Sequence, residues 1–375
     1  MSKIGLICPY NLCYGGGVQE YVLAMQAELK RRGHSVYIIT PSVREKCDQI
    51  HHDTLFIGTG TDLKSPFHTT AQISASINPE EIEGILQEHH FDILHFHEPW
   101  VPMLSRQILA KSSSVNIATF HAKLPDTVFS RTIEKVITPY TRSILKDLDS
   151  LTAVSDAAAQ YVRTITKEPI NIIPNGIDLK KYKPTKGAKS GSIKTILYIG
   201  RLERRKGIQH LLEAFERLDD PNVRLVIAGT GADREKLEEF VDEHSIKHVK
   251  FLGFVDEQTK LDLLAEADLF CSPAIYGESF GIVLLEAMAT STVTVAANNP
   301  GYVSVMKDRG AMSLVNPRDT DEFTRRLHLL LYDEGLRKLW QTWAKDYVKQ
   351  FDYRSVVDRY EILYRDVLKQ HKKKS

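Results

Sequence analysis

The feature that most constrains the fold is an alternation of short apolar runs with amphipathic segments, repeated on both sides of a Lys-, Gly- and Ser-rich linker at 180–192. Before the linker, strands are predicted at 3–8, 36–39, 91–96, 116–120, 151–154 and 170–173. After it, strands at 195–199, 223–228 and 249–252 alternate with helices at 207–218, 233–243 and 258–265. Such alternation favours parallel sheets covered by helices on both faces. The sequence therefore predicts an α/β protein with two doubly wound domains.

The composition limits what the chain binds and where it works. Its 375 residues suffice for two domains, and 49 Lys and Arg balance 48 Asp and Glu, so no overall charge attracts nucleic acid. The cysteines (Cys8, Cys13, Cys47 and Cys271) are too few and too scattered for a disulfide scaffold or a closed zinc site, so free thiols are expected. No apolar run approaches the ~20 residues that span a bilayer, and no signal-peptide core precedes the first strand. We expect a cytoplasmic protein whose membrane contact is at most peripheral.

The first strand is followed by a glycine-ended loop at 10–17 and a helix at 18–32. A turn of this kind is compatible with phosphate binding, and dinucleotide-dependent oxidoreductases are one class that uses it. Two features argue against that class: Gly15-Gly16-Gly17 is not G-x-G-x-x-G, and Thr40-Pro41-Ser42 provides no acid for an adenosine ribose. Gly16 and Gly17 are better explained as letting the backbone approach the phosphate or sugar of a donor.

A second anion site is predicted at 277–289, G-E-S-F-G-I-V-L-L-E-A-M-A. From Gly281 onward these residues indicate a helix, so Glu278 and Ser279 precede its first turn. The free backbone N–H groups and the dipole at a helix start attract an anion. Glu278 and Glu286 are too far apart to act as a paired acid and base, but they suit the hydroxyls of a sugar and a ribose, as in a nucleotide sugar. The alternative is a buried helix with an N-terminal carboxylate cap.

The same stretch resembles the E-x7-E signature of the retaining glycosyltransferases of family 4, which have the GT-B fold. Further segments resemble the phosphatidylinositol mannosyltransferase branch, in the same order along nearly the whole chain: Cys8-Pro9-Tyr10, Gly16-Gly17-Val18-Gln19, His97-Glu98-Pro99, Thr119-Phe120-His121, Ala153-Val154-Ser155-Asp156 and Ile173-Pro174-Asn175-Gly176. The resemblance implies two facing Rossmann-like domains with a C-terminal helix that crosses back to the first. It places the acceptor-side domain at 1–177 plus 354–375 and the nucleotide-sugar-binding domain at 178–353.

The resemblance also implies roles for single residues. Arg201 and Lys206 occupy the family's R-x4-K position after a strand, where fixed cations stabilise a departing diphosphate. The neighbouring Arg204 and Arg205 are expected to be solvated. His121 occupies the position of the family's essential histidine and is expected to bond the donor sugar or to stabilise positive character at its anomeric carbon.

These roles define a predicted site. The catalytic residues are expected to be His121, Arg201, Lys206 and Glu278. The donor is expected to contact Gly16, Gly17, Val255, Lys260, Ser279, Phe280, Gly281, Ile282 and Glu286. Tyr10 and Gln19, near the glycine loop, are the candidates for acceptor binding.

No metal and no other cofactor is expected. The His95-Phe96-His97-Glu98 segment lacks the further ligands of a metal site, and a strand end that faces a ligand cleft explains it better. Asp147-Leu148-Asp149 has the D-x-D pattern of the other glycosyltransferase fold, but it lies at a helix end, where carboxylates are usually solvated. The family that the chain resembles works without a metal.

The resemblance implies a retaining hexosyltransferase, with mannose from GDP-mannose and a phosphatidylinositol-like membrane lipid as the first expectation. Front-face substitution is implied, in which the leaving phosphate helps to deprotonate the acceptor hydroxyl. One alternative is a UDP-sugar-dependent glucosyltransferase that acts on diacylglycerol or a small soluble acceptor. Another is a non-catalytic nucleotide-sugar-binding protein, against which the intact site residues argue.

Several local expectations follow from residue types. The polar stretch 58–77 predicts an irregular loop, Pro139 is expected to divide the helical stretch 127–148, and the tail at 340–369 is expected to be helical. The acidic helix at 79–90 would be repelled by anionic headgroups. Contact with an anionic membrane surface is therefore expected through Arg131, Lys135, Arg142 and Lys146, with Lys123 and the lysines at 372–374 as further candidates.

Overall fold

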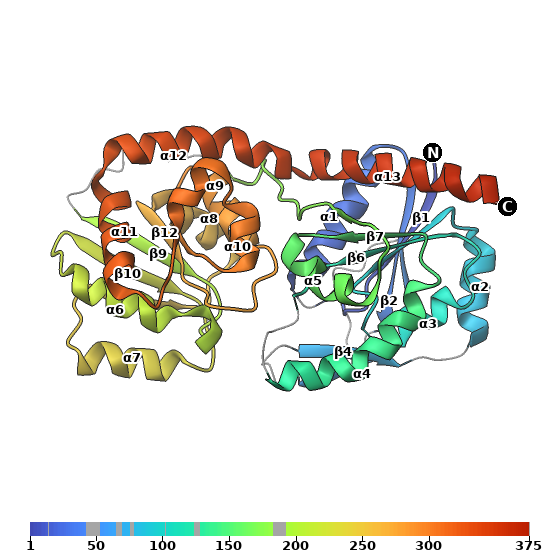
Figure 1. Cartoon of the computed structure of the whole chain (residues 1–375), viewed down its shortest axis with the longest axis horizontal. Helices are drawn as coiled ribbons and strands as arrows, with labels where there is room; N and C mark the ends of the chain where they lie inside the picture. The colour runs from blue at the N-terminus through green and yellow to red at the C-terminus, as the bar shows by residue number, and fades with distance from the viewer. Residues whose placement is uncertain are drawn as a thin grey trace. The chain divides into compact units, whose positions relative to one another are not determined.

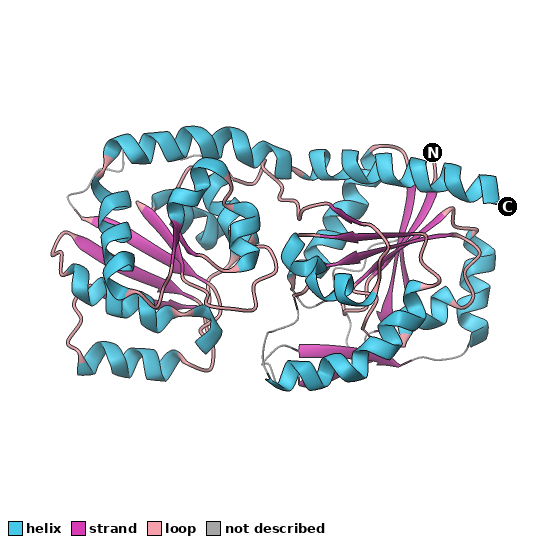
Figure 2. Ribbon diagram, in the orientation of Figure 1, coloured by secondary structure: helices cyan, strands magenta, loops and turns pink. Residues whose placement is uncertain are grey.

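The computed structural model describes residues 1–13, 15–42, 53–64, 70–75, 79–101, 103–123, 128–182 and 193–374 (Figure 1). The chain divides into two compact units. Met1–Gly176 and Tyr353–Ser375 form the first, and Ile177–Asp352 forms the second. Each unit has one sheet with helices on both of its sides (Figure 2).

In the described part of the first unit, eight strands form a sheet in the order β4-β3-β2-β1-β5-β6-β7-β8. The strands are β1 (Lys3–Ile7), β2 (Ser35–Ser42), β3 (Thr54–Lys64), β4 (Thr70–Ala75), β5 (Ile93–His97), β6 (Val115–Phe120), β7 (Ser150–Ala153) and β8 (Ile170–Ile172). Neighbouring strands are parallel, apart from the antiparallel pair β3 and β4. The helices are α1 (Gly17–Arg31), α2 (Pro79–His89), α3 (Leu104–Leu109), α4 (Val128–Leu145), α5 (Asp156–Ile165) and α13 (Tyr353–Lys374).

In the residues of the second unit that the structure describes, six parallel strands form a sheet in the order β11-β10-β9-β12-β13-β14. Its strands are β9 (Lys194–Ile199), β10 (Val223–Ala228), β11 (Val249–Gly253), β12 (Leu269–Ser272), β13 (Val293–Ala297) and β14 (Leu314–Val315). Its helices are α6 (Ile208–Leu218), α7 (Arg234–Glu243), α8 (Glu257–Glu266), α9 (Ile282–Ala289), α10 (Pro300–Val305), α11 (Thr320–Tyr332) and α12 (Glu334–Tyr347). It also has short 3-10 turns: η1 (Arg204–Lys206), η2 (Asp308–Ser313) and η3 (Val348–Phe351).

The strand order reverses direction between β1 and β5 in the first sheet and between β9 and β12 in the second. In open α/β sheets, ligands bind at the carboxyl ends of the strands beside such a reversal. In the first unit the segments after these strands carry Tyr10 and Glu98, and in the second they carry Lys206 and Glu278. The topology therefore gathers candidate residues at the edge of each sheet where a ligand is expected.

The C-terminal helix α13 packs on the core of the first unit, as the family resemblance implied. It contributes apolar and aromatic side chains to the buried cluster that also contains residues of β1 and α1: Val356, Val357, Tyr360, Tyr364 and Val367. The Tyr364 hydroxyl lies 2.7 Å from Nδ1 of His95, and the Tyr360 hydroxyl lies 3.1 Å from Oγ1 of Thr119. The tail is therefore a structural part of the first unit.

Two expectations for the first unit are wrong. Within 58–77, β3 and β4 form an antiparallel pair from Thr59 to Ala75 instead of an irregular loop. Threonines are well suited to an edge strand, because backbone hydrogen bonds form there without a core on both faces. Helix α4 continues through Pro139. Within this helix the Thr141 hydroxyl donates to the carbonyl of Ile137 at 3.0 Å.

The tail at 340–369 is mostly helical, as expected, and it is divided into two helices. Helix α12 ends at Tyr347 and α13 begins at Tyr353, with η3 between them. The chain enters the second unit at Ile177 and leaves it at Asp352. These two ends are joined, because the backbone N–H of Ile177 donates to the carbonyl of Phe351 at 2.8 Å. Aromatic residues recur on both sides of this point, so the sequence pattern does not show where one helix ends and the next begins.

The cysteines and the helices bear on two further expectations. Cys8 and Cys271 are free and buried, but Cys13 is disulfide-bonded, which contradicts the expectation of free thiols. Cys47 lies outside the described residues.

Among the described residues, no helix is long and apolar enough to cross a membrane. Arg142 and Lys146 are exposed, and the side chains of Arg131 and Lys135 lie outside the described set.

We predict that α13 contributes a large share of the stability of the first unit. Tyr360→Ala should lower the free energy of unfolding by about 3–5 kcal/mol, because it leaves a cavity under a side chain that is fully buried. Ile362→Ala on the same helix is the matched control and should change little, because Ile362 is 51% exposed. Urea unfolding measures both. Equal losses in the two variants would show that α13 is not docked through its tyrosine face.

Candidate functional site

In the second unit, a glycine holds the loop after β9 against the segment after β12. Gly207 follows η1 with a φ of 66°, and a Cβ at this position would lie 2.3 Å from the carbonyl oxygen of Pro273. Only glycine permits this approach and this conformation. The loop carries Lys206, whose Nζ lies 2.7 Å from Oε1 of Glu278. The structure thus brings together two residues predicted to be catalytic.

Arg205 belongs to the same cluster, contrary to the expectation that it is solvated. Its Nη1 lies 2.9 Å from Oε1 of Glu278, and its Nε lies 2.8 Å from Oε2 of Glu203. Although burial opposes it, the carboxylates of Glu278 and Glu203 raise the pKa of Arg205 above its ordinary value. Arg204 is exposed, as expected. A run of charged residues does not by itself indicate which side chain turns inward.

Arg201 is linked to this cluster through Glu203. Its Nη1 lies 2.8 Å from Oε1 of Glu203, and about half of its side chain (49%) is exposed. Glu203 thereby bridges Arg201 and Arg205, and Glu278 bridges Arg205 and Lys206. Arg201, Arg205 and Lys206 are thus ion-paired with two carboxylates in the segment after β9 and the loop before α9. These pairs fix the positions of the cations before any ligand binds.

Helix α9 begins where the sequence predicted. Gly281 is its N-cap with a φ of 104°, and Glu278 and Ser279 precede the first turn. The start of α10 packs against this loop so closely that a Cβ at Gly301 would lie 2.4 Å from the carbonyl oxygen of Glu278. Phe280 is buried and Ile282 is the first residue of the helix. The loop is therefore held on both sides.

Glu286 forms a second cluster one helix turn further into α9. Its Oε1 accepts from Nζ of Lys260 at 2.9 Å and from the hydroxyl of Tyr182 at 2.8 Å. The structure thus joins the predicted ribose ligand to one predicted base contact, Lys260, while Val255 lies partly buried just after β11. No local pattern pointed to Tyr182, because a tyrosine beside a linker is identified only by the carboxylate that it contacts.

In the first unit, the glycine loop is closed by Gln19. A Cβ at Gly16 would lie 2.5 Å from Oε1 of Gln19, and Nε2 of Gln19 lies 3.4 Å from the carbonyl oxygen of Asn11. Gly17 is the first residue of α1. Gly16 therefore makes room for a side chain of this chain, and ligand contacts of Gly16, Gly17 and Gln19 stay predictions.

His121 lies at the end of β6 among buried polar groups. Its Nε2 lies 3.0 Å from Nδ1 of His97, and its ring packs edge-on against that of Tyr21. His95, on the same strand as His97, lies 2.6 Å from Oγ1 of Thr119 through Nε2. Burial lowers the pKa of both His95 and His121 to about 3, and burial with the neighbouring imidazoles lowers that of His97 as well. The ring of His121 is therefore neutral at physiological pH.

Glu98 holds the backbone of His121, and sequence reasoning did not assign it this role. Its carboxylate accepts the backbone N–H groups of His121 and Ala122, the latter at 2.5 Å. Glu98 has a φ of 51°, which non-glycine residues seldom adopt. Burial raises its pKa to about 7, although the two backbone N–H groups oppose the rise. Burial is also the main cause of a raised pKa at Tyr10, followed by the charge of Glu98. Tyr10, a predicted acceptor-binding residue, is thus electrostatically coupled to Glu98.

The two segments considered as metal ligands have structural partners. Nδ1 of His97 faces His121, and Oδ2 of Asp149 accepts the backbone N–H of Asn116 at 2.8 Å. Within the described ranges, no group of three or more His, Cys, Asp or Glu side chains is arranged to hold a metal ion. The metal independence of the activity stays a prediction.

Known proteins resemble this chain over nearly its whole length. The family description "Glycosyltransferase Family 4" matches residues 15–181, and "Glycosyl transferases group 1" matches residues 180–347. The phosphatidyl-myo-inositol mannosyltransferase of Mycolicibacterium smegmatis is 31% identical over 94% of this chain and 90% of its own length.

Solved structures share the fold. The sucrose-phosphate synthase of Thermosynechococcus elongatus superposes with a TM-score of 0.79, at 21% identity, over 99% of this chain and all of its own. Anabaena Alr3699/HepE in complex with UDP-glucose superposes with a TM-score of 0.75, at 19% identity, over 97% of this chain and 99% of its own. The fold is therefore GT-B, and the family matches and the relative make the chain a glycosyltransferase.

The chain belongs to glycosyltransferase family 4.

We predict that Glu278→Gln lowers turnover by roughly ten- to hundredfold while nucleotide affinity is retained. The amide removes the charge that Lys206 and Arg205 share, and a charge-assisted hydrogen bond is worth about 1.5–3 kcal/mol. Steady-state kinetics and nucleotide titration separate the two effects. Glu243→Gln, on the exposed end of α7, is the control and should leave both unchanged. Full turnover in Glu278→Gln would refute the assignment of Glu278 to the donor sugar.

We predict that acid destabilises the first unit through its buried histidines. Their folded-state pKa values lie below 6.5, so the stability that they contribute is complete above pH 6.5 and is lost as the pH falls towards 3. Glu98 acts in the opposite direction, because its contribution is present below its ordinary pKa of 4.5 and is lost as the pH rises through about 7. Three histidines outweigh one glutamate, so the free energy of unfolding should increase from about pH 5 to pH 6.5.

Glu98→Gln should steepen this increase by about 1.4 kcal/mol per pH unit, because it removes the opposing titration. His244→Gln changes an exposed histidine of the second unit and should leave the slope as it is. Urea unfolding across the pH range tests both variants. A slope in Glu98→Gln equal to that of the wild type would contradict the raised pKa of Glu98.

Proposed function

We propose that the chain transfers mannose from GDP-mannose to a phosphatidylinositol-like lipid, with retention of configuration and without a metal ion. The observation that carries this proposal is the cluster of Lys206 and Arg205 on Glu278 beside the start of α9. The choice of mannose and of a lipid acceptor is supported by the name of the M. smegmatis relative.

The cluster suits a departing nucleoside diphosphate. Negative charge develops on the phosphate as the sugar leaves, and cations that are already in place stabilise it without reorganisation. Arg201 and Lys206 would serve this role together with the backbone N–H groups at the start of α9. Glu278 keeps Arg205 and Lys206 in position and would accept hydrogen bonds from the hydroxyls of the donor sugar. Glu286, held by Lys260, would accept those of the ribose.

A neutral His121 suits the same reaction. Positive character develops at the anomeric carbon, and a charged imidazolium nearby would oppose it, whereas a neutral ring does not. Burial keeps the ring neutral, since its pKa lies at about 3. Nε2 of His121 is bonded to His97, so a bond from Nε2 to the sugar would require these two rings to separate. In front-face substitution, the departing phosphate would lie on the side of the sugar where the acceptor hydroxyl attacks. The phosphate could therefore accept the proton of that hydroxyl.

We place the reaction at the cytoplasmic face of a membrane, with the protein bound peripherally to anionic lipid. Arg142 and Lys146 on and after α4 are exposed cations, and each contributes about 1 kcal/mol near an anionic surface. Helix α2 carries Glu80 and Glu81 in its first turn and would face away from such a surface.

A UDP-sugar donor is the second candidate, because the Anabaena structure with the same fold is a complex with UDP-glucose. The GT-B fold alone does not distinguish the two bases. The acceptor would then be diacylglycerol or a small soluble molecule.

We predict that purified protein transfers mannose from GDP-mannose to phosphatidylinositol in anionic vesicles, and does so in EDTA. Product formation is followed by thin-layer chromatography, and NMR of the product should show the anomeric configuration of the donor. In a thermal-shift comparison, GDP should stabilise the protein more than UDP or ADP. A ligand at 100 times its Kd contributes about 2.7 kcal/mol.

Each arm has a result that would change the proposal. Transfer only from UDP-glucose would favour the second candidate. Loss of activity in EDTA with recovery on adding magnesium would overturn metal independence. Transfer to a soluble polyol but not to vesicles would replace the lipid acceptor.

A further inference from the structure

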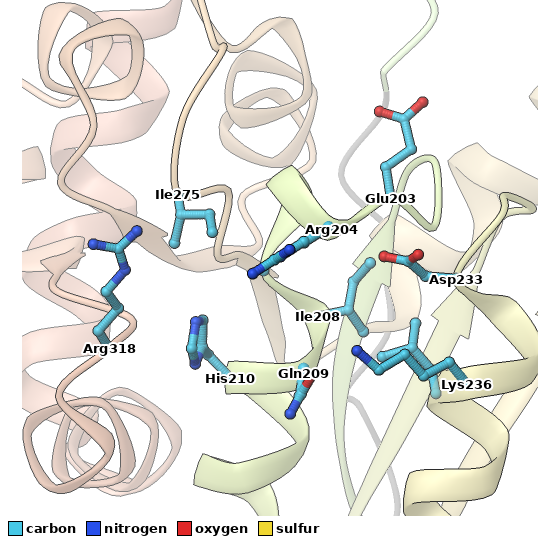
Figure 3. A pocket seen from close by; sticks show the side chains of 11 residues that line it. Glu203, Arg204, Ile208, Gln209, His210, Asp233, Lys236, Ile275 and Arg318 are labelled. Carbon is cyan, nitrogen blue, oxygen red and sulfur yellow. The ribbon is translucent and has the colours of Figure 1, made fainter. Parts of the chain in front are cut away.

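A separate pocket of about 430 Å³ lies in the second unit, lined by residues of η1, α6 and α7 and by two segments that follow strands (Figure 3). Its lining is Glu203, Arg204, Gly207, Ile208, Gln209, His210, Asp233, Lys236, Leu237, Ile275 and Arg318. It includes none of the predicted donor ligands. The proposed function therefore leaves this pocket unexplained.

Three cations surround the pocket. Arg204, Lys236 and Arg318 are exposed, and among the described residues none of the three has a carboxylate within ion-pair distance. Figure 3 shows Arg204 pointing towards His210, with Arg318 on a different segment beyond His210. Like charges around one hollow repel each other unless an anion lies between them. Two carboxylates also line the pocket. Glu203 is already bonded to Arg201 and Arg205, so Asp233 is the main counter-charge and the three cations remain in excess.

The remaining lining indicates that the ligand is larger than a bare anion. A hollow of this volume is of the size that holds small organic ligands. Gln209 and Asp233 provide acceptors for hydroxyl groups, and Ile208, Leu237 and Ile275 provide an apolar wall. Arginine is suited to phosphate because its planar fork donates two parallel hydrogen bonds.

We propose that this pocket binds a phosphomonoester of a polyol, with its phosphate between Arg204, Arg318 and Lys236 and its hydroxyls toward Gln209 and Asp233. Two sources carry this chemistry: a free sugar phosphate, and a lipid whose headgroup ends in a phosphomonoester. Arg204 belongs to the same short turn as Lys206, so the pocket lies next to the donor cluster in the chain but uses other side chains.

The test measures binding directly and requires no turnover. Isothermal titration uses glucose 6-phosphate, glucose and inorganic phosphate, and flotation uses vesicles that contain phosphatidic acid. The test variant is Arg318→Gln with Lys236→Gln, and the matched control is Arg325→Gln with Lys247→Gln, two exposed cations on or beside the same helices. Thermal unfolding checks that both variants fold.

We expect glucose 6-phosphate to bind more tightly than inorganic phosphate, and glucose not to bind. The test variant should weaken this binding about tenfold or more, while the control and saturating GDP leave it unchanged. If phosphatidic acid vesicles bind instead, and the test variant abolishes that binding, the proposal holds with the lipid as the source. The proposal is overturned if neither probe binds, if inorganic phosphate binds as tightly as the sugar phosphate, if the test variant binds like the wild type, or if GDP displaces the sugar phosphate.

Discussion

The ion pair between Lys206 and Glu278 is the interaction on which the rest of the second unit's site depends. It joins the loop after β9 to the loop after β12, the two strands between which the sheet order reverses. Gly207 permits the approach, because any side chain there would collide with the carbonyl of Pro273. Arg205 and Glu203 extend the pair to Arg201. One ion pair thus fixes a set of cations at the edge where a diphosphate would lie.

The first unit is organised around buried imidazoles instead. His95 and His97 belong to β5, and His121 follows the neighbouring strand β6; burial keeps all three rings neutral. The C-terminal helix contributes to this arrangement, because the Tyr364 hydroxyl bonds His95. Glu98 fixes the backbone at His121 through two N–H groups. The tail of the chain, distant in sequence, therefore supports the residue that the family resemblance identifies as essential.

Local sequence was sufficient where a pattern has one structural meaning. The alternation of apolar runs and amphipathic segments predicted both sheets, because parallel strands need helical connections between them. The start of α9 was predicted at Gly281, and the structure has this glycine as the N-cap of the helix, in a left-handed conformation. The same reasoning failed at Thr59–Lys64 and Thr70–Ala75, where polar residues form an edge pair of strands, and at Pro139, where the helix tolerates the missing N–H.

The sequence by itself determined the two-unit α/β organisation and the positions of Lys206, Glu278, Glu286 and His121 along the chain, because strand ends and helix starts follow from local patterns. Only the tertiary structure decided which charged groups meet. Arg204 and Arg205 are neighbours with the same charge, yet one lies in a solvent-facing pocket and the other is paired with Glu278. Tyr182 and Glu286 are 104 residues apart and share a hydrogen bond. Such pairings depend on burial and on distances between loops, and neither is encoded in the neighbourhood of a single residue.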